Sequence, residues 1–387
     1  MAEGRATTVT DEPAAAPGAA AGKHPALLVR EAEPLNAGPP PELQRAAFVT
    51  PTELFFVRNH APVPRLDPDA FRLAVRGLVE RSLELSLAEL GERFPRAEVT
   101  ATLQCAGQRR DELAAVRPVP GELPWGAEPV SNACWAGVRL ADVLTAAGPE
   151  PGARHAVFRG LDEVEREGRR FGFGGSVPLA KALSPEVLLA TEMNGEPLPP
   201  VHGGPLRVVV PGYIGARSVK WLAEIELSSR SSDNYFQAKA YRLYPSHVSK
   251  ETADPAQAFE LGELAVTSTI TSPRAGEAVG PGPVRVEGIA LAGGGRRVER
   301  VELSGDGGAT WTPAGLGAEG DGWTWRFFAG EVALVPGRDE IAARAWDSAA
   351  QTQPESAAAV WNHKGYMNSS WARVRVRPQR PGERGVG

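Results

Sequence analysis

MNGEPLPPVHGGPLRVVVPGYIGARSVKW, residues 193–221, is the stretch from which the rest of the chain can be interpreted. Between residues 198 and 222 lie Arg207, Arg217 and Lys220, but no Asp or Glu. The glycines of this stretch allow the backbone to approach a ligand closely, and such turns point N–H groups at an anion. The spacing fits neither a P-loop nor a dinucleotide fingerprint. The stretch therefore predicts a phosphate-bearing cofactor held in another way, with a basic surface loop as the alternative.

The apolar run LRVVVPG inside this stretch is one of several short strand-like runs in residues 46–250. FRLAVRGLV and HAVFRGL are others, whereas LSLAELGERF and LADVLTAAG have helical spacing. Ser86 and Glu89 lie three residues apart at the start of the first helical stretch and predict a capping box. Residues 46–250 are therefore expected to form a mixed α+β domain with a large loop content.

The pattern changes after about residue 258. Strand-like runs then follow one another with Gly, Pro and Asp between them and little helical signal: LAVTSTITSP, PVRVEGIALAGG, RVERVELSGDGGATW, WTWRFFAGEV, DEIAARAWDSA and WARVRVRP. This pattern is typical of an antiparallel β-sandwich of immunoglobulin type, expected over residues 258–378. Residues 1–45 are rich in Ala, Pro and Gly, and we expect a flexible N-terminal arm there.

Composition excludes several classes of protein. The chain has 387 residues, 42% of them hydrophobic, and a net charge of −5, which argues against a general nucleic-acid binder. No apolar run approaches the roughly 18 residues of a membrane span, and the first residues lack the features of a leader. We expect a cytoplasmic protein, or a periplasmic one if a leader was trimmed. Its two cysteines, Cys105 and Cys134, lack the C-x-x-C spacing of a zinc or redox site.

A second candidate segment is TLQCAGQRR, residues 102–110. A strand-like run ends at Cys105, and Arg109 and Arg110 follow a tight turn. Nearby positive charge lowers a thiol's pKa, and the thiolate is both a nucleophile and a soft metal ligand. The alternative is a buried structural cysteine beside arginines in surface salt bridges.

A third segment is FFVRNHAPVP, residues 55–64, in which Arg58 and His60 precede a Pro-rich turn that fixes the backbone. Alone, this segment is weak evidence for a site, because a single His is usually a structural residue whose hydrogen bonds are satisfied. Together the three segments supply a thiol and several cations, which favours an anionic cofactor with a metal and an anionic substrate. The alternative on these residues is a cysteine-nucleophile hydrolase, for which the sequence singles out neither a base nor an orienting carboxylate.

With SNACWAGVRL (131–140), SGDGGATW (304–311) and AWDSAAQTQPE (345–355), these segments resemble the sulfite oxidase family of molybdenum (pyranopterin) oxidoreductases in a haem-free form. The resemblance covers about residues 50–377. It implies that the C-terminal sandwich is the dimerisation domain of a homodimer. It also implies that the thiolate of Cys105 ligates molybdenum. Cys134 stands where the family has a basic residue, and we expect it to be inert.

The resemblance assigns further residues to two groups. Those that match the pterin-binding positions are Phe56, Val57, Arg58, Asn59, His60, Asp162, His202, Arg207, Ser218, Val219 and Lys220. Those that match the substrate pocket are Arg58, Arg110, Trp125 and Tyr241. The last pocket position falls in WNHKG, residues 361–365, where Lys364 replaces an arginine of the vertebrate enzymes. Lysine keeps the charge but loses the bidentate fork that suits a small oxyanion.

The implied activity is oxidation of sulfite to sulfate by oxygen-atom transfer at molybdenum. No C-x-x-C-H haem site is present in the sequence, so electrons are expected to pass to an external acceptor, either dioxygen or a cytochrome. Two alternatives remain: a reductase of nitrate or a sulfoxide on the same cofactor, and a non-enzymatic interaction protein whose pocket has decayed.

Overall fold

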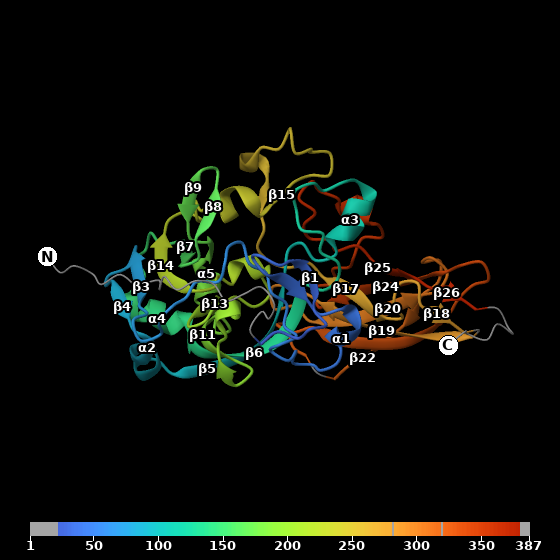
Figure 1. Ribbon diagram of the computed structural model, residues 1–387, viewed down its shortest axis with the longest axis horizontal. Coiled ribbons are helices and arrows are strands. Elements are labelled where there is room, and N and C mark those ends of the chain that lie inside the picture. The colour runs from blue at the N-terminus through green and yellow to red at the C-terminus, as the bar shows by residue number, and fades with distance from the viewer. Residues whose placement is uncertain (1–21, 281, 319, 380–387) are drawn as a thin grey trace.

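The computed structural model describes residues 22–280, 282–318 and 320–379. Figure 1 shows two parts placed end to end along the long axis: most of the earlier residues form one part and residues after about 260 form the other, while residues 41–44 and 110–116 lie against the second part. Strands dominate both parts, and short helices occur mainly in the first. The fold is thus a mixed α+β domain followed by an all-β domain. No helix among the described residues is long and apolar enough to span a membrane.

Two five-stranded sheets build the first part. The first has the order β10 (Gly174–Pro178), β7 (His155–Gly160), β14 (Leu222–Ser228), β3 (Leu73–Gly77) and β4 (Leu83–Leu85). The second has the order β12 (Glu196–Pro197), β11 (Leu188–Met193), β6 (Val130–Arg139) and β5 (Arg96–Gln104), with β13 (Arg207–Val209) also paired to β11. The pairing of β14 with β3 is parallel, and the other pairings in these two sheets are antiparallel.

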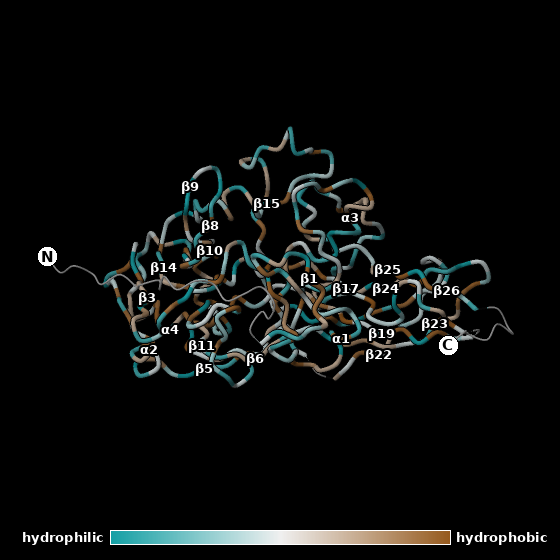
Figure 2. The backbone as a smooth tube through the Cα atoms, viewed as in Figure 1, coloured by the Kyte–Doolittle hydropathy of each residue, from teal (hydrophilic) through white to brown (hydrophobic). Residues whose placement is uncertain are grey.

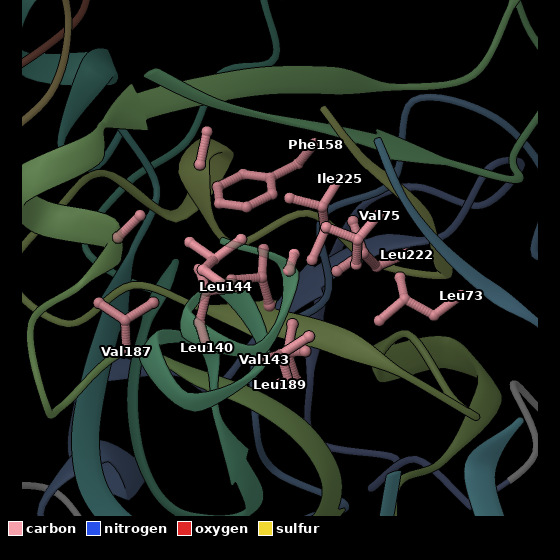
Figure 3. Close-up of a cluster of buried hydrophobic side chains, with 14 of the residues drawn as sticks. Leu73, Val75, Leu140, Val143, Leu144, Phe158, Val187, Leu189, Leu222 and Ile225 are labelled. Carbon is pink, nitrogen blue, oxygen red and sulfur yellow. The ribbon is translucent and has the colours of Figure 1, made fainter. Parts of the chain in front are cut away.

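Both sheets and three helices share one apolar core. Helix α4 (Leu140–Ala147) buries residues at 140, 143, 144 and 147, which is one face of a helix. Figure 3 shows three of these side chains in the same cluster as Val75 of β3 and Leu189 of β11. The predicted capping box of α2 (Leu87–Arg93) is confirmed, since the Ser86 hydroxyl accepts from Glu89 N and the Glu89 carboxylate accepts from Ser86 N.

The second part consists of two four-stranded antiparallel sheets around a common core. One has the order β17 (Thr267–Ser272), β19 (Pro283–Leu291), β23 (Arg326–Ala333) and β22 (Gly315–Leu316). The other has the order β21 (Thr312–Pro313), β20 (Val298–Ser304), β24 (Glu340–Asp347) and β25 (Ala372–Arg375). Val286 and Phe328 of the first sheet lie in one buried cluster with Val301 and Ile341 of the second. Each of the six predicted strand runs therefore contains a strand.

Shorter elements connect these layers. The short helices are α1 (Pro41–Gln44), α3 (Arg110–Val116) and α5 (Leu179–Ala182). The 3₁₀ turns are Pro200–His202, Gly215–Arg217, Pro255–Gln257 and Ala357–Val360, and Phe236–Ala240 is a π turn. The two-stranded pairs are β1 (Leu28–Glu31) with β2 (Asn36–Gly38), β8 (Val164–Arg166) with β9 (Arg169–Phe171), β15 (Arg242–Leu243) with β16 (Phe259–Glu260), and β18 (Ala278–Val279) with β26 (Arg377–Pro378). Figure 2 shows hydrophobic residues along the inner strands and hydrophilic ones on outer loops such as the β8–β9 turn.

The predicted flexible arm over residues 1–45 is wrong for the part that the structure describes, because residues 1–21 lie outside the described residues but 22–45 form β1, β2 and α1. Asn36 explains the difference: its side chain is fully buried and accepts from Asn59 N at 2.8 Å while donating to Asn59 O at 3.1 Å. Ala37 also pairs with Val57 through the backbone. Leu27 and Ala37 also join Leu54 in a small buried apolar cluster. Composition cannot reveal these contacts, because each depends on a partner outside the segment.

Candidate functional site

The three segments singled out in the sequence meet at one cavity in the first part. It encloses about 720 Å³ of empty space, its mouth included, and Cys105 and Tyr241 line it. The other predicted cofactor residues that line it are Phe56, Val57, Arg58, Asn59, His60, Asp162, His202, Arg207, Ser218, Val219 and Lys220. Residues predicted from distant parts of the sequence are therefore brought together here.

Cys105 lies directly after β5, where the chain turns towards α3. Its backbone N–H donates to Pro129 O at 2.9 Å, and its sulfur accepts from Gly107 N at 3.4 Å. The thiol is 6% exposed and faces the cavity. Among the described residues no group of three or more His, Cys, Asp or Glu side chains could hold a metal. A metal at Cys105 would thus take its remaining ligands from a cofactor rather than from further side chains.

The cavity is also lined by cations, of which Arg207 is buried and Lys220 half-buried. Arg207 donates to His202 O and Ser218 O, both at 2.8 Å, and its Nε has no hydrogen-bond partner among the residues that the structure describes. Lys220 donates to Val201 O at 3.1 Å and to the Asn59 side chain. Burial lowers the pKa of Arg207 to about 9 and lowers the pKa of Lys220 well below its usual value. These cations are held by neutral acceptors, so their charge is left largely uncompensated.

Asp162 is the one carboxylate among the described residues that line the cavity. It accepts from Phe173 N at 2.8 Å, and burial raises its pKa. A single carboxylate cannot balance Arg58, Arg207 and Lys220. Buried charges without partners are strongly unfavourable, so the site is suited to an anionic ligand. The unpartnered Arg207 Nε and the thiol that lines the same cavity fit a phosphate-bearing group that also carries a metal able to take a thiolate ligand.

His60 and Tyr241 form a buried polar pair on another wall. The His60 Nε2 lies 2.9 Å from the Tyr241 hydroxyl, and its Nδ1 lies 3.2 Å from Arg58 Nη2. Burial and the positive charges of Arg58, Arg166, Lys220 and Arg110 hold the pKa of His60 well below its usual value. Burial raises the pKa of Tyr241 to about 12. Both side chains are therefore neutral at physiological pH.

An outer basin adjoins the cavity, and Arg58, Asn59 and His60 line both. Its other charged lining residues are Glu31, Glu122, Arg166, Lys239, Lys250 and Lys364. Cations outnumber carboxylates along it, although the whole chain carries a net charge of −5. The basin therefore favours the approach of an anion to the cavity.

The structure places the remaining predicted substrate residues behind or outside the cavity. Lys364 lies in the outer basin and forms an ion pair with Glu122. Arg110 is buried, donates to Leu123 O at 2.8 Å and lies 5.1 Å from the ring of Tyr366. Trp125 is fully buried in the apolar cluster that contains Cys105, and within the described part of the chain its indole N–H has no hydrogen-bond partner. Arg110 and Trp125 do not line the cavity in this structure.

Arg109 does not flank the thiol as the sequence led us to expect. Its backbone is left-handed (φ 58°), which turns the side chain towards the second domain. There its guanidinium donates to Ser268 O, Ser370 O and Trp371 O and pairs with Glu112 at 2.7 Å. Arg109 therefore joins the two domains, and the interpretation as a thiol-activating charge was wrong for it.

Two residues at the site were missed by sequence reasoning. Glu122 neutralises Lys364 and lies 3.8 Å from Arg110, but its surroundings GELPWG carry no motif. Lys23 belongs to the segment predicted to be flexible, yet its ammonium donates to Thr52 O and Phe55 O and lies 3.0 Å from His202 Nε2. Burial lowers the pKa of Lys23 to about 7. Cys134 lies away from the cavity, and burial raises its pKa to about 11.

Comparison with known proteins gives consistent matches along the chain. Residues 60–236 match the oxidoreductase molybdopterin binding domain, and residues 259–379 match the Mo-co oxidoreductase dimerisation domain. Sulfite oxidase of Gallus gallus is 47% identical, covering 91% of this chain and 78% of that protein. Sulfite oxidase of Arabidopsis thaliana is 39% identical, covering 92% of this chain and 95% of that protein. The chain spans 66% of the length of the mammalian mitochondrial sulfite oxidases.

Two further matches differ in their stated activities. NADH nitrate reductase 1 of Oryza sativa subsp. japonica is 38% identical, covering 94% of this chain but 42% of that protein. The crystal structure of the sulfane dehydrogenase SoxCD from Paracoccus pantotrophus superposes with a TM-score of 0.72 at 26% identity, covering 89% of this chain and 86% of that one. The two-domain architecture is thus shared by proteins whose names state three different activities.

Proposed function

The chain belongs to the sulfite oxidase family of molybdenum oxidoreductases, and on that premise we propose that it oxidises sulfite to sulfate with a molybdenum–pyranopterin cofactor. One observation carries the proposal: a buried thiol lines the same cavity as an excess of buried and half-buried cations, and among the described residues the buried Arg207 Nε has no hydrogen-bond partner. A decayed interaction protein would not be expected to keep this costly arrangement.

The residues that would hold the cofactor follow from the cavity. Cys105 would supply the thiolate to the metal, and Arg207, Lys220 and His202 would hold the anionic end of the pterin. The group, when bound, supplies two-electron oxygen-atom transfer chemistry. The reaction balances as sulfite and water giving sulfate, two electrons and two protons. The chain itself positions the substrate and neutralises its charge.

The outer basin provides the route by which sulfite would enter. Its cations attract the dianion, and Arg58 lines both the basin and the cavity. Arg58 is thus the residue that a bound oxyanion would meet at the inner end of this route. We place Tyr241 beside it as a hydrogen-bond donor, because its phenol is neutral and faces the cavity.

Electrons would leave to an external acceptor, either dioxygen or a cytochrome. We further propose a homodimer formed through the second domain, which is supported by the match to a dimerisation domain. The strand order β17-β19-β23-β22 facing β21-β20-β24-β25 supports an immunoglobulin type, as it corresponds to A-B-E-D and C′-C-F-G. A cytoplasmic location is supported by two free cysteines.

The test compares sulfite oxidation with nitrate reduction on one preparation that carries molybdenum and pterin. The match to a plant nitrate reductase makes nitrate the second candidate substrate. The proposal expects sulfate to form with an artificial electron acceptor, and little nitrite to form with a strong artificial donor. Efficient nitrate reduction without sulfite oxidation would reverse the assignment.

A further inference from the structure

Arg58, His60 and Tyr241 form a continuous hydrogen-bonded chain that ends at the cavity. Arg58 Nη2 lies 3.2 Å from His60 Nδ1, and His60 Nε2 lies 2.9 Å from the Tyr241 hydroxyl. The three groups come from two segments about 180 residues apart, which the fold brings together. The direction of each hydrogen bond in this chain can be derived from the chemistry of its members.

The guanidinium of Arg58 donates hydrogen bonds and has no acceptor. Nδ1 of His60 must therefore be the acceptor in the contact with Arg58. A neutral imidazole carries one proton, so that proton lies on Nε2. Nε2–H then donates to the Tyr241 oxygen. The hydroxyl proton of Tyr241 cannot be directed at His60, because both groups would be donors.

The surroundings hold this chain in place. The imidazole of His60 stacks on Phe173 with ring centroids 5.2 Å apart and contacts Phe236 at 4.4 Å. Arg58 also donates to the Asn36 side chain at 3.1 Å. The Tyr241 ring stacks on Tyr366 at 5.3 Å. The cations Arg58, Arg166, Lys220 and Arg110 all act on His60 and disfavour its protonated form.

We propose that His60 is a positioning residue that, by occupying the Tyr241 oxygen as a donor, directs the Tyr241 hydroxyl proton into the cavity. There the hydroxyl donates to the oxyanion of the substrate. This inference rests on the proposed function, since it assigns a role within the sulfite site. Arg58 then has two tasks: it meets the anion, and it selects the His60 tautomer that makes Tyr241 a donor.

The first test observes the tautomer directly in the loaded enzyme. Protein labelled with ¹⁵N-histidine contains six imidazoles, and His60→Gln identifies the signals of His60 by their loss. Long-range ¹H–¹⁵N correlation spectra should show a neutral ring with the proton on Nε2 throughout pH 6–9. A proton on Nδ1, or a charged ring at pH 7, would overturn the proposal whatever the activity is.

The second test uses a double-mutant cycle on sulfite oxidation, with molybdenum and pterin content verified for every variant. His60→Phe keeps the ring stacking but removes the donor. We expect kcat to fall on the order of tenfold or more, and the largest fall expected is the effect of removing one oxyanion donor from the site. His60→Gln, which can still accept from Arg58 and donate to Tyr241, should recover most of that loss. In a Tyr241→Phe background, His60→Phe should have no further effect.

Additive effects in the cycle, or equal losses in the Gln and Phe variants, would contradict the positioning role. Because the wild-type protein is assayed in parallel, failure of the proposed function is distinguishable. A wild-type enzyme that does not oxidise sulfite contradicts the function, whereas an active one with additive variants contradicts only the inference. Should His60→Phe fail to fold, the spectra and the Gln variant still decide the matter.

Discussion

Individual side chains determine the charge balance of the cavity. Arg58, Arg207 and Lys220 face it with Asp162 as a single opposing carboxylate among the described lining residues. In the outer basin the balance is different, because Glu122 pairs with Lys364. Substitution of single residues in these two places should therefore separate cofactor binding from substrate binding.

At Cys105, replacement by Ser should abolish turnover while leaving the fold intact. A Ser hydroxyl is far less acidic than a thiol and stays protonated at neutral pH, so it does not supply the anionic sulfur donor that the metal would take here. We expect sulfite-dependent kcat to fall at least about a hundredfold, and the circular dichroism spectrum to be unchanged. Cys134→Ser, which alters a thiol away from the cavity, is the matched control and should keep full activity. Full activity of Cys105→Ser would rule out the ligand assignment.

Glu122 should weaken the attraction of the basin for anions. Its carboxylate pairs with Lys364 and lies 3.8 Å from Arg110, so Glu122→Gln leaves both cations uncompensated. We expect the KM for sulfite to fall roughly three- to tenfold with little change in kcat. Lys364→Met should change KM in the opposite direction. Glu150→Gln, at an exposed position outside the basin, is the control. An unchanged or higher KM in Glu122→Gln would contradict this interpretation.

Residues that carry a recognisable local pattern could be predicted from sequence, and those that act through distant partners could not. Cys105 and the segment from His202 to Lys220 stand in distinctive surroundings, and the structure places them at one cavity. Glu122 stands 242 residues from Lys364, so its role depends on a contact that no local pattern records. Arg109 and Arg110 are adjacent in sequence, yet the left-handed backbone at Arg109 sends their side chains to different places.

At the scale of elements, the junction between α3 and the second domain depends on Arg109. Its guanidinium is 2% exposed and satisfies three backbone carbonyls beyond residue 260. Arg109→Met leaves those carbonyls unpaired, and we expect the free energy of unfolding to fall by about 3 kcal/mol in urea titrations. The exposed Arg230→Met should change it by less than about 0.5 kcal/mol. Equal effects of the two variants would show that Arg109 does not join the domains.

Elements with regular hydrophobic patterns were predictable, whereas those ordered by polar contacts were not. The α4 stretch has apolar residues at helical spacing, and the capping box marks the start of α2. The segment of β1 and β2 is instead tied to the rest of the fold by the buried amide of Asn36, which bonds Asn59, and by a small apolar cluster that contains Leu27, Ala37 and Leu54. These partners are distant in sequence, so composition alone suggested disorder there.

For the whole molecule, the buried cations predict how the stability of the cofactor-free protein depends on pH. Lys220 has a folded-state pKa well below its unfolded value of 10.5, so the unfolded chain binds more protons between those two values. Charged Lys220 destabilises the folded protein to the full extent at pH values below its folded-state pKa. This destabilisation disappears as the pH approaches 10.5. The free energy of unfolding of the apoprotein should therefore rise with pH in that window, relative to Lys220→Met.

Urea titrations of the two apoproteins across this pH range measure the difference directly. Lys250→Met, which removes an exposed lysine of the outer basin, is the control and should follow the wild-type slope. Parallel pH profiles for wild type and Lys220→Met would contradict the prediction, because the buried charge would then have no energetic consequence. Added phosphate should stabilise the wild-type apoprotein most strongly at the acidic end, where Lys220 is charged.

The overall architecture could be predicted better than the joint between its parts. The boundary between the two domains is visible in the sequence, because mixed helical and strand-like runs give way there to strand-like runs only. Alternating hydrophobicity is a local property, so a local pattern reveals it. The cluster that joins them contains Ile214, Tyr241, Ile289 and Trp325, which are far apart in sequence. Packing of this kind depends on the complete fold, so no local pattern indicates it.

The central claim is that this cavity supports molybdenum-dependent oxidation of sulfite. Its most direct test is steady-state, sulfite-dependent reduction of ferricyanide by protein purified from a host that makes the cofactor. We expect turnover with two ferricyanide ions reduced per sulfate formed, and we expect Cys105→Ser to abolish it. Protein that carries molybdenum and pterin but shows no sulfite-dependent reduction would contradict the claim.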